Sequence, residues 1–102
     1  MQPQTLDELT DLVHEAIYEI DEMRVAVEDS DPEDDWERYR DVLDRLDDPL
    51  RRLFSDLTEG RYQAAEGQDL PFAPLIGFLG DEVPLKSLLM DINRAHRGGV
   101  KS

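Results

Sequence analysis

Two ladders of apolar residues constrain this chain more than any other feature of its sequence. Their members are Leu6, Leu9, Val13, Ala16, Ile20, Met23 and Val27 in the first, and Trp36, Tyr39, Leu43, Leu46, Leu50, Leu53 and Leu57 in the second. Alternating steps of three and four residues place all members of a ladder on one face of an α-helix. Because only a short acidic segment separates the ladders, we expect two long helices that pack together as an antiparallel hairpin.

Signals at the helix ends set the expected boundaries. Thr5 and Glu8 have the spacing of a capping box, so the first helix should cover residues 5–28. Pro32 is favourable at a first helical position, so the second helix should cover residues 32–59. The expected contacts at the two ends of the hairpin are Val27 with Trp36 and Leu6 with Leu57.

Pro49 lies inside the second ladder. A proline in a helix interior removes one backbone hydrogen bond and clashes with the carbonyl four residues earlier. Yet Leu46 and Leu50 keep the ladder in register on both sides of it, whereas a loop would reset the phase. We therefore predict a kink at Pro49 within one continuous helix.

The segment 68–83 is rich in proline and glycine, and it is apolar for a connector. Its large apolar residues are Leu70, Phe72, Leu75, Ile76, Phe78 and Leu79. We expect them to cover the open seam of the hairpin, and a recognition loop is the alternative. A third helix of about residues 81–97 follows, with Leu85, Leu88, Leu89, Ile92 and Ala95 on one face. This helix is too short to cover the hairpin alone, so a homodimer is expected unless residues 70–79 fill the gap.

The sequence thus predicts one all-α domain over residues 1–102, a helical bundle built from a long antiparallel hairpin, an irregular apolar segment and a shorter third helix. The absence of cysteine excludes disulfides and thiolate metal sites. No stretch is long and apolar enough to cross a bilayer, and residues 1–4 lack the features of a secretory signal, so we expect a cytoplasmic protein that does not enter membranes.

The net charge of −14 is unevenly distributed. Residues 1–35 carry thirteen acidic residues and Arg24 as their one basic residue, whereas residues 84–102 carry four Lys or Arg residues and Asp91 as their one acidic residue. Such a chain repels phosphate backbones, which argues against direct nucleic-acid binding, and it suits a basic protein partner. The alternative is host adaptation to high salt or a GC-rich genome, since Asp outnumbers Glu and Arg outnumbers Lys.

Five carboxylates follow one another along the first helix at steps of three or four residues. This acidic stripe consists of Asp7, Asp11, Glu15, Glu19 and Glu22. Like charges at this spacing disfavour a helix by about 0.2–0.5 kcal/mol per pair, so we expect a compensating cation. Arg94, Arg97 and Lys101 are the candidates within the chain or a dimer mate, and a basic partner is the alternative. The predicted partner-binding residues are the acidic stripe together with Trp36, Phe72 and Phe78.

A metal site is the competing interpretation. Glu19 and Glu22 on the first helix, with Asp41, Asp44 and Asp47 on the second, have the residue types with which all-α nucleotide pyrophosphohydrolases hold magnesium. The second Glu-x-x-Asp motif of those enzymes is missing, and none of the five residues interrupts an apolar ladder. We therefore expect solvated carboxylates and no metal.

His14 and His96 are the two histidines of the chain and the remaining candidates for a catalytic role. His14 should lie at the edge of the first helix, and His96 should complement the helix dipole as a cation in the last turn of the third. Neither has a partner in sequence that would make a metal shell or a nucleophile pair. The sequence therefore predicts a non-enzymatic protein–protein interaction module without a cofactor: an adaptor, regulator or chaperone-like protein, including an inhibitor or nucleic-acid mimic that acts on a basic partner.

Overall fold

The predicted helical bundle is confirmed by a computed structural model, which describes residues 5–29, 38–63 and 67–98. Its helices are α1 (Leu6–Asp29), α2 (Arg40–Thr58), α3 (Ala73–Ile76) and α4 (Pro84–Gly98). Helix α1 packs against both α2 and α4, and the short α3 packs against α4 and α2. None of the described helices combines the length and the apolar character needed to cross a membrane.

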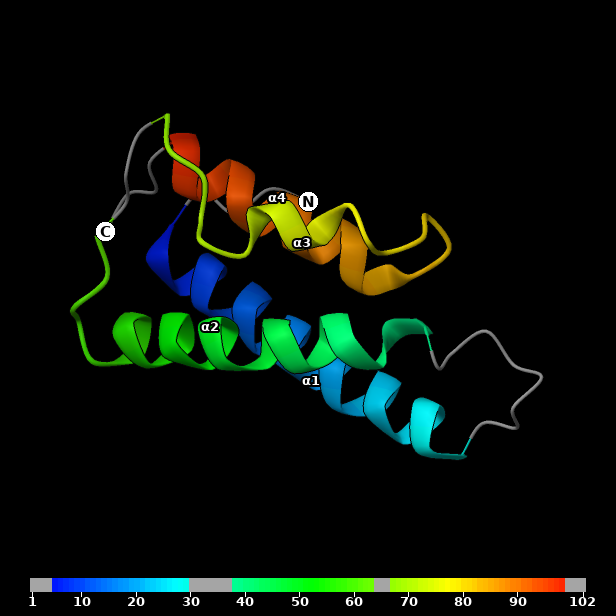
Figure 1. Cartoon of the computed structure of the whole chain (residues 1–102). Helices are drawn as coiled ribbons and strands as arrows, with labels where there is room; N and C mark the ends of the chain where they lie inside the picture. Colours follow the sequence, from blue (N-terminus) through cyan, green and yellow to red (C-terminus); the bar gives the residue numbers. More distant parts are fainter. Residues whose placement is uncertain (1–4, 30–37, 64–66, 99–102) are drawn as a thin grey trace.

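Helices α1 and α2 run in opposite directions along each other, as Figure 1 shows, and form the expected antiparallel pair. The ladder positions from Leu9 to Val27 and from Tyr39 to Leu53 are buried, and Leu57 is partly buried. Ile17 and Val42 join the core from positions beside the ladders. The 3.6-residue period therefore decides which face of each helix lies inward.

The helix ends follow local capping chemistry. The backbone N–H of Glu8 donates to the Thr5 hydroxyl over 3.1 Å, as in a capping box. Helix α2 continues through Pro49 to Thr58. Gly60 follows with φ of +76°, a left-handed conformation that glycine adopts without strain. The predicted start of this helix at Pro32, and Trp36 with its expected contact to Val27, lie outside the described residues.

The apolar segment between α2 and α4 covers the hairpin. Leu70, Phe72, Leu79 and Val83 are buried in the same core as the ladders, and Leu75 and Ile76 are partly buried against it. The segment is not wholly irregular, because it contains the single turn of α3. Together with α4 it fills the seam, so an uncovered ladder no longer provides a reason for dimerisation.

The two phenylalanines of this segment have opposite environments. Phe72 is 1% exposed and is among the largest fully buried side chains. The expectation that Phe72 contacts a partner is therefore wrong, because its ring belongs to the core. Phe78 is 69% exposed and remains accessible.

Candidate functional site: an acidic groove between α1 and α4

A groove of about 860 Å³ runs between α1 and α4. We call it the acidic groove, because five carboxylates line it: Glu8, Asp11, Glu15, Glu19 and Asp91. Its other lining residues are Leu12, His14, Tyr18, Pro84, Ser87 and Leu88. The groove therefore combines a negative rim with apolar and aromatic surface, which is the composition of a surface that binds an amphipathic segment.

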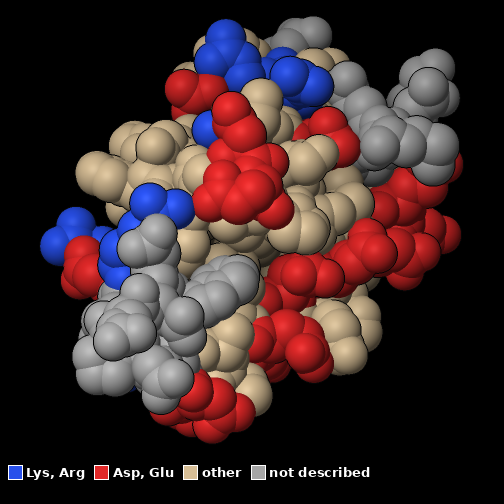
Figure 2. Space-filling view, turned by 90° about the vertical axis from the view of Figure 1, so that its right-hand side faces the viewer, with Lys and Arg blue, Asp and Glu red and all other residues tan. Residues whose placement is uncertain are grey.

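Helical periodicity explains how the carboxylates come together. Asp11, Glu15 and Glu19 are spaced by four residues, so they stand about one turn apart on the same face of α1. Asp7 and Glu22 extend the acidic stripe beyond the two ends of the groove. In Figure 2 a band of Asp and Glu side chains crosses the right-hand side of the face, while most of the visible Lys and Arg side chains gather at its top and left.

The carboxylates of α2 have arginine partners. Asp41, Asp47 and Asp48 each pair with the arginine four residues later, at 2.8–3.1 Å. Asp44 pairs with Arg24 of α1 at 2.9 Å, which joins the two helices. The acidity of α2 is thus largely neutralised within the fold.

The described part of the chain offers no such partner to the acidic stripe of α1. Across residues 5–29, 38–63 and 67–98, no Lys or Arg lies within ion-pair distance of its five carboxylates. Arg94 contacts Asp91 at 3.6 Å and Arg97 contacts Asp69 at 2.6 Å, so the same-chain cations expected for the stripe are engaged elsewhere. Lys101 lies outside the described residues.

Tyr18 and His14 form the aromatic part of the groove. Tyr18 is 58% exposed, and a hydrogen bond to the Glu22 carboxylate raises the pKa of its hydroxyl. The exposed His14 ring lies 5.6 Å from the ring of Phe54 on α2. These contacts hold both side chains at the edge of α1, beside the acidic stripe.

The five carboxylates of the alternative metal site are not brought together. Asp41, Asp44 and Asp47 are engaged by Arg45, Arg24 and Arg51 respectively. On α1, Glu19 faces the acidic groove. In the part of the chain that the structure describes, no group of three or more His, Asp or Glu side chains is placed to hold a metal ion.

His96 does not act as the exposed cation that its position in the last turn of α4 indicated. It is 8% exposed, and its Nδ1 lies 2.7 Å from the hydroxyl of Tyr62. Burial lowers the pKa of His96, although the Asp69 carboxylate opposes this shift, and burial raises the pKa of Tyr62. Both shifts favour the uncharged forms of the two side chains, and the hydrogen bond between them joins the residues after α2 to α4.

Several groove residues were not among the sequence candidates, namely Leu12, Tyr18, Leu88 and Asp91. Leu12 lies beside the first ladder and Leu88 belongs to the apolar face of α4, so the sequence pattern predicts both to be core positions. They are only partly buried, because they line the open groove between α1 and α4. One sequence signal could have identified the apolar part of the groove. Leu12 and Tyr18 are large side chains that lie next to members of the acidic stripe, Asp11 and Glu19.

Known proteins give no additional guide to this site. Comparison of the chain with protein-family models, with curated proteins and with solved structures found no match. The function is therefore inferred from the geometry and charge of the groove.

Proposed function

We propose that this protein is a non-enzymatic interaction module that binds a basic, amphipathic helical segment of a partner protein in the acidic groove. The observation that carries the proposal is the contrast in ion pairing between the helices. Arginines of the same chain neutralise the carboxylates of α2, whereas those of the acidic stripe have none within the described residues. A uniform adaptation to salt would not predict this difference between two helices of one hairpin.

The spacing of the carboxylates favours a helical occupant. Asp11, Glu15 and Glu19 are separated by steps of about 6 Å along the axis of α1. A helix with Lys or Arg every four residues presents charges at the same interval, so the two rows match when the helices lie side by side. Each exposed ion pair contributes about 0.2–1 kcal/mol, so charge alone gives weak binding.

Apolar contacts supply the remaining affinity. Leu12 and Leu88 are partly buried and Tyr18 is exposed, all within the acidic groove. The apolar face of an amphipathic helix would remove these side chains from water, at about 25 cal/mol for each Å² buried. The partner we infer therefore has a row of basic residues beside a row of leucine-like residues. A basic nucleic-acid-binding protein with such a helix would be inhibited by occupancy of the groove, which is the narrower form of this proposal.

The experiment uses a designed helical peptide with Lys at every fourth position and Leu on the adjacent face. A second peptide has the same composition in a shuffled order, so that its charges and leucines do not segregate. Isothermal titration of each peptide into the protein should give tighter binding for the amphipathic peptide. This affinity should fall between about 0.1 M and about 1 M salt, as the Debye length shortens from ~10 Å to ~3 Å.

Amide chemical-shift changes locate the bound peptide. The proposal requires them to concentrate on α1 and α4 around the acidic groove, with small changes on the outer face of α2. Equal affinity for the two peptides, or shifts distributed over all acidic surfaces, would show non-specific charge attraction and would overturn the proposal.

A further inference from the structure

A second surface lies on the α2–α3 side of the bundle, away from the acidic groove. It contains a concavity of about 360 Å³, and Phe78 stands at its edge. We call it the Phe78 surface, formed by Leu75, Phe78, Arg38, Asp41, Val42 and Arg45. The same patch thus carries an exposed aromatic side chain and a hollow beside it.

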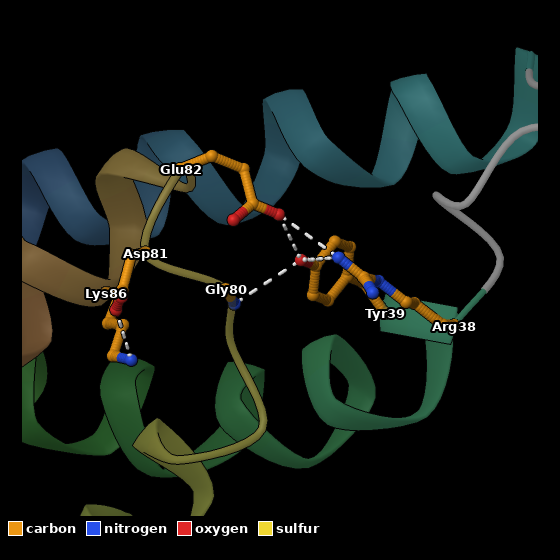
Figure 3. Close-up of polar contacts among 6 residues, drawn as sticks. All are labelled: Arg38, Tyr39, Gly80, Asp81, Glu82 and Lys86. Atoms are coloured by element: carbon orange, nitrogen blue, oxygen red, sulfur yellow. Dashed lines mark hydrogen bonds and ion pairs between the residues drawn. The ribbon is translucent and has the colours of Figure 1, made fainter.

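The chain around Phe78 is held in place on both sides. Its backbone N–H donates to the Leu75 carbonyl over 3.0 Å, and the next residue, Leu79, is 2% exposed. The N–H of Gly80 donates to the Tyr39 hydroxyl over 3.3 Å, and this hydroxyl donates to Glu82 Oε1 over 3.0 Å. Figure 3 shows the contacts of Gly80 and Glu82 converging on the Tyr39 hydroxyl. Phe78 is therefore presented by an ordered loop, so its burial against another molecule would require little further ordering of the chain.

The electrostatics of this surface differ from those of the rest of the molecule. Residues 70–80 contain no charged side chain, although 36 of the 102 residues of the chain are Asp, Glu, Lys or Arg. At the edge of the concavity Asp41 and Arg45 pair at 3.1 Å, and both are mostly exposed. Two copies with net charge −14 therefore repel each other least when they meet through this surface.

We propose that the Phe78 surface is a two-fold symmetric self-association surface. Such an interface uses the same patch on both copies, so the patch must be complementary to itself. The Phe78 surface meets this condition, because Phe78 of each copy can enter the concavity of the other. The charges of the surface are complementary to themselves as well, since Arg45 of each copy can face Asp41 of the other across the two-fold axis.

This dimer leaves the acidic groove uncovered, because the groove lies between α1 and α4. Each dimer then presents two grooves, and a partner with two basic segments gains avidity from binding both. The self-association itself rests on different residues from the proposed function, so either can fail without the other.

Sedimentation equilibrium measures the self-association directly. The wild-type chain should form a dimer in about 0.5 M salt, where charge repulsion between copies is screened. Phe78→Ser should weaken the dimer by about tenfold or more, since exposed aromatic anchors dominate such interfaces. Val25→Ser is the matched control, because Val25 is 55% exposed on α1, and it should leave the dimer unchanged. Circular dichroism of each variant checks that the fold is retained.

A charge-exchange experiment tests the two-fold arrangement. Arg45→Glu and Asp41→Arg each place like charges opposite one another in a homodimer, so each variant alone should be mainly monomeric. In an equimolar mixture the two variants restore opposite charges at both contacts, so a dimer should reappear. A monomeric wild type, equal effects of Phe78→Ser and Val25→Ser, or a mixture that stays monomeric would overturn the proposal.

Discussion

The hydroxyl of Tyr39 donates a hydrogen bond to Glu82 Oε1 over 3.0 Å, and so joins the beginning of α2 to the loop that precedes α4. The Tyr39 hydroxyl oxygen also accepts hydrogen bonds from Arg38 over 2.7 Å and from the Gly80 N–H over 3.3 Å. Tyr39 itself is 3% exposed. One buried side chain thus fixes the loop that carries Phe78. The position of Phe78 on the surface therefore depends on the packing of Tyr39 in the core.

Removal of this hydroxyl should be costly. Tyr39→Phe keeps the ring but leaves three polar groups without their shared partner, so we expect the free energy of unfolding to fall by about 1–2 kcal/mol. Urea denaturation monitored by circular dichroism measures this change as a lower midpoint at constant slope. Tyr18→Phe is the control, because the Tyr18 hydroxyl is on the exposed face of α1, and it should change the free energy by less than about 0.5 kcal/mol. Equal midpoints for Tyr39→Phe and wild type would contradict the structural role of this contact.

Alanine substitution of the two phenylalanines of the apolar segment should have very different effects on the free energy of unfolding. Phe72→Ala leaves a cavity in the core and should lower the free energy of unfolding by about 3–5 kcal/mol, whereas Phe78→Ala should change it by less than about 0.5 kcal/mol. Denaturation at about 1 µM protein keeps any dimer from contributing to the difference. Similar losses for the two variants would contradict the burial of Phe72 and the exposure of Phe78.

The ladders allowed α1 and α2 to be predicted from sequence, because each helix buries one face and the period alone identifies it. The continuity of α2 through Pro49 followed from the same register. The segment 68–83 has no period, so Phe72 and Phe78 carry equal signals in the sequence although one is buried and the other exposed. The two residues lie on either side of the α3 turn, which directs Phe72 into the core and leaves Phe78 exposed. This turn packs against α2 and α4, so a local pattern does not reveal it.

The polar contacts were less accessible to prediction for a related reason. The acidic stripe was visible as a helical repeat, and its residues do share one face of α1. Tyr62 and His96, or Tyr39 and Glu82, are 34 and 43 residues apart and meet only in the folded bundle. No local rule pairs them, which is why His96 was expected as an exposed cation and Asp91 was absent from the predicted site.

Burial of His96 should make stability depend on pH. Its pKa in the folded state is lowered by burial, so the unfolded chain takes up the proton first as the pH falls. The stabilising effect of the neutral ring is complete above the unfolded pKa of about 6.5, and it is lost as the pH falls from there toward the folded pKa. Denaturation at several pH values should show this slope in the wild type and in His14→Gln, and a smaller slope in His96→Gln. The same slope in all three proteins would assign the effect to other groups.

The acidic stripe should reduce the stability of the isolated protein. Asp11→Asn, Glu15→Gln and Glu19→Gln together, the α1 triple variant, remove the four like-charge pairs within the acidic stripe, each of about 0.2–0.5 kcal/mol. We expect the free energy of unfolding to rise by about 1–2 kcal/mol at low salt, and the gain to shrink at about 1 M salt as screening replaces it. A variant less stable than wild type at low salt would show that the stripe has stabilising contacts within the chain.

A charge-matched control variant separates the acidic groove from general acidity. The α2 control variant combines Asp44→Asn, Asp48→Asn and Asp56→Asn, which change the net charge by the same amount as the α1 triple variant. Asp44 and Asp48 have arginine partners, and all three residues lie outside the groove. The two variants therefore differ in where charge is removed and not in how much.

The most direct measurement of the central claim is isothermal titration of the amphipathic basic peptide into wild type, the α1 triple variant and the α2 control variant. The α1 triple variant should bind about tenfold more weakly, since three exposed ion pairs of ~0.5 kcal/mol correspond to about one factor of ten in Kd. The α2 control variant should stay within about threefold of wild type, a difference of ~0.7 kcal/mol. Equal weakening in both variants, or unchanged binding by the α1 triple variant, would contradict recognition of a basic helix by the acidic groove.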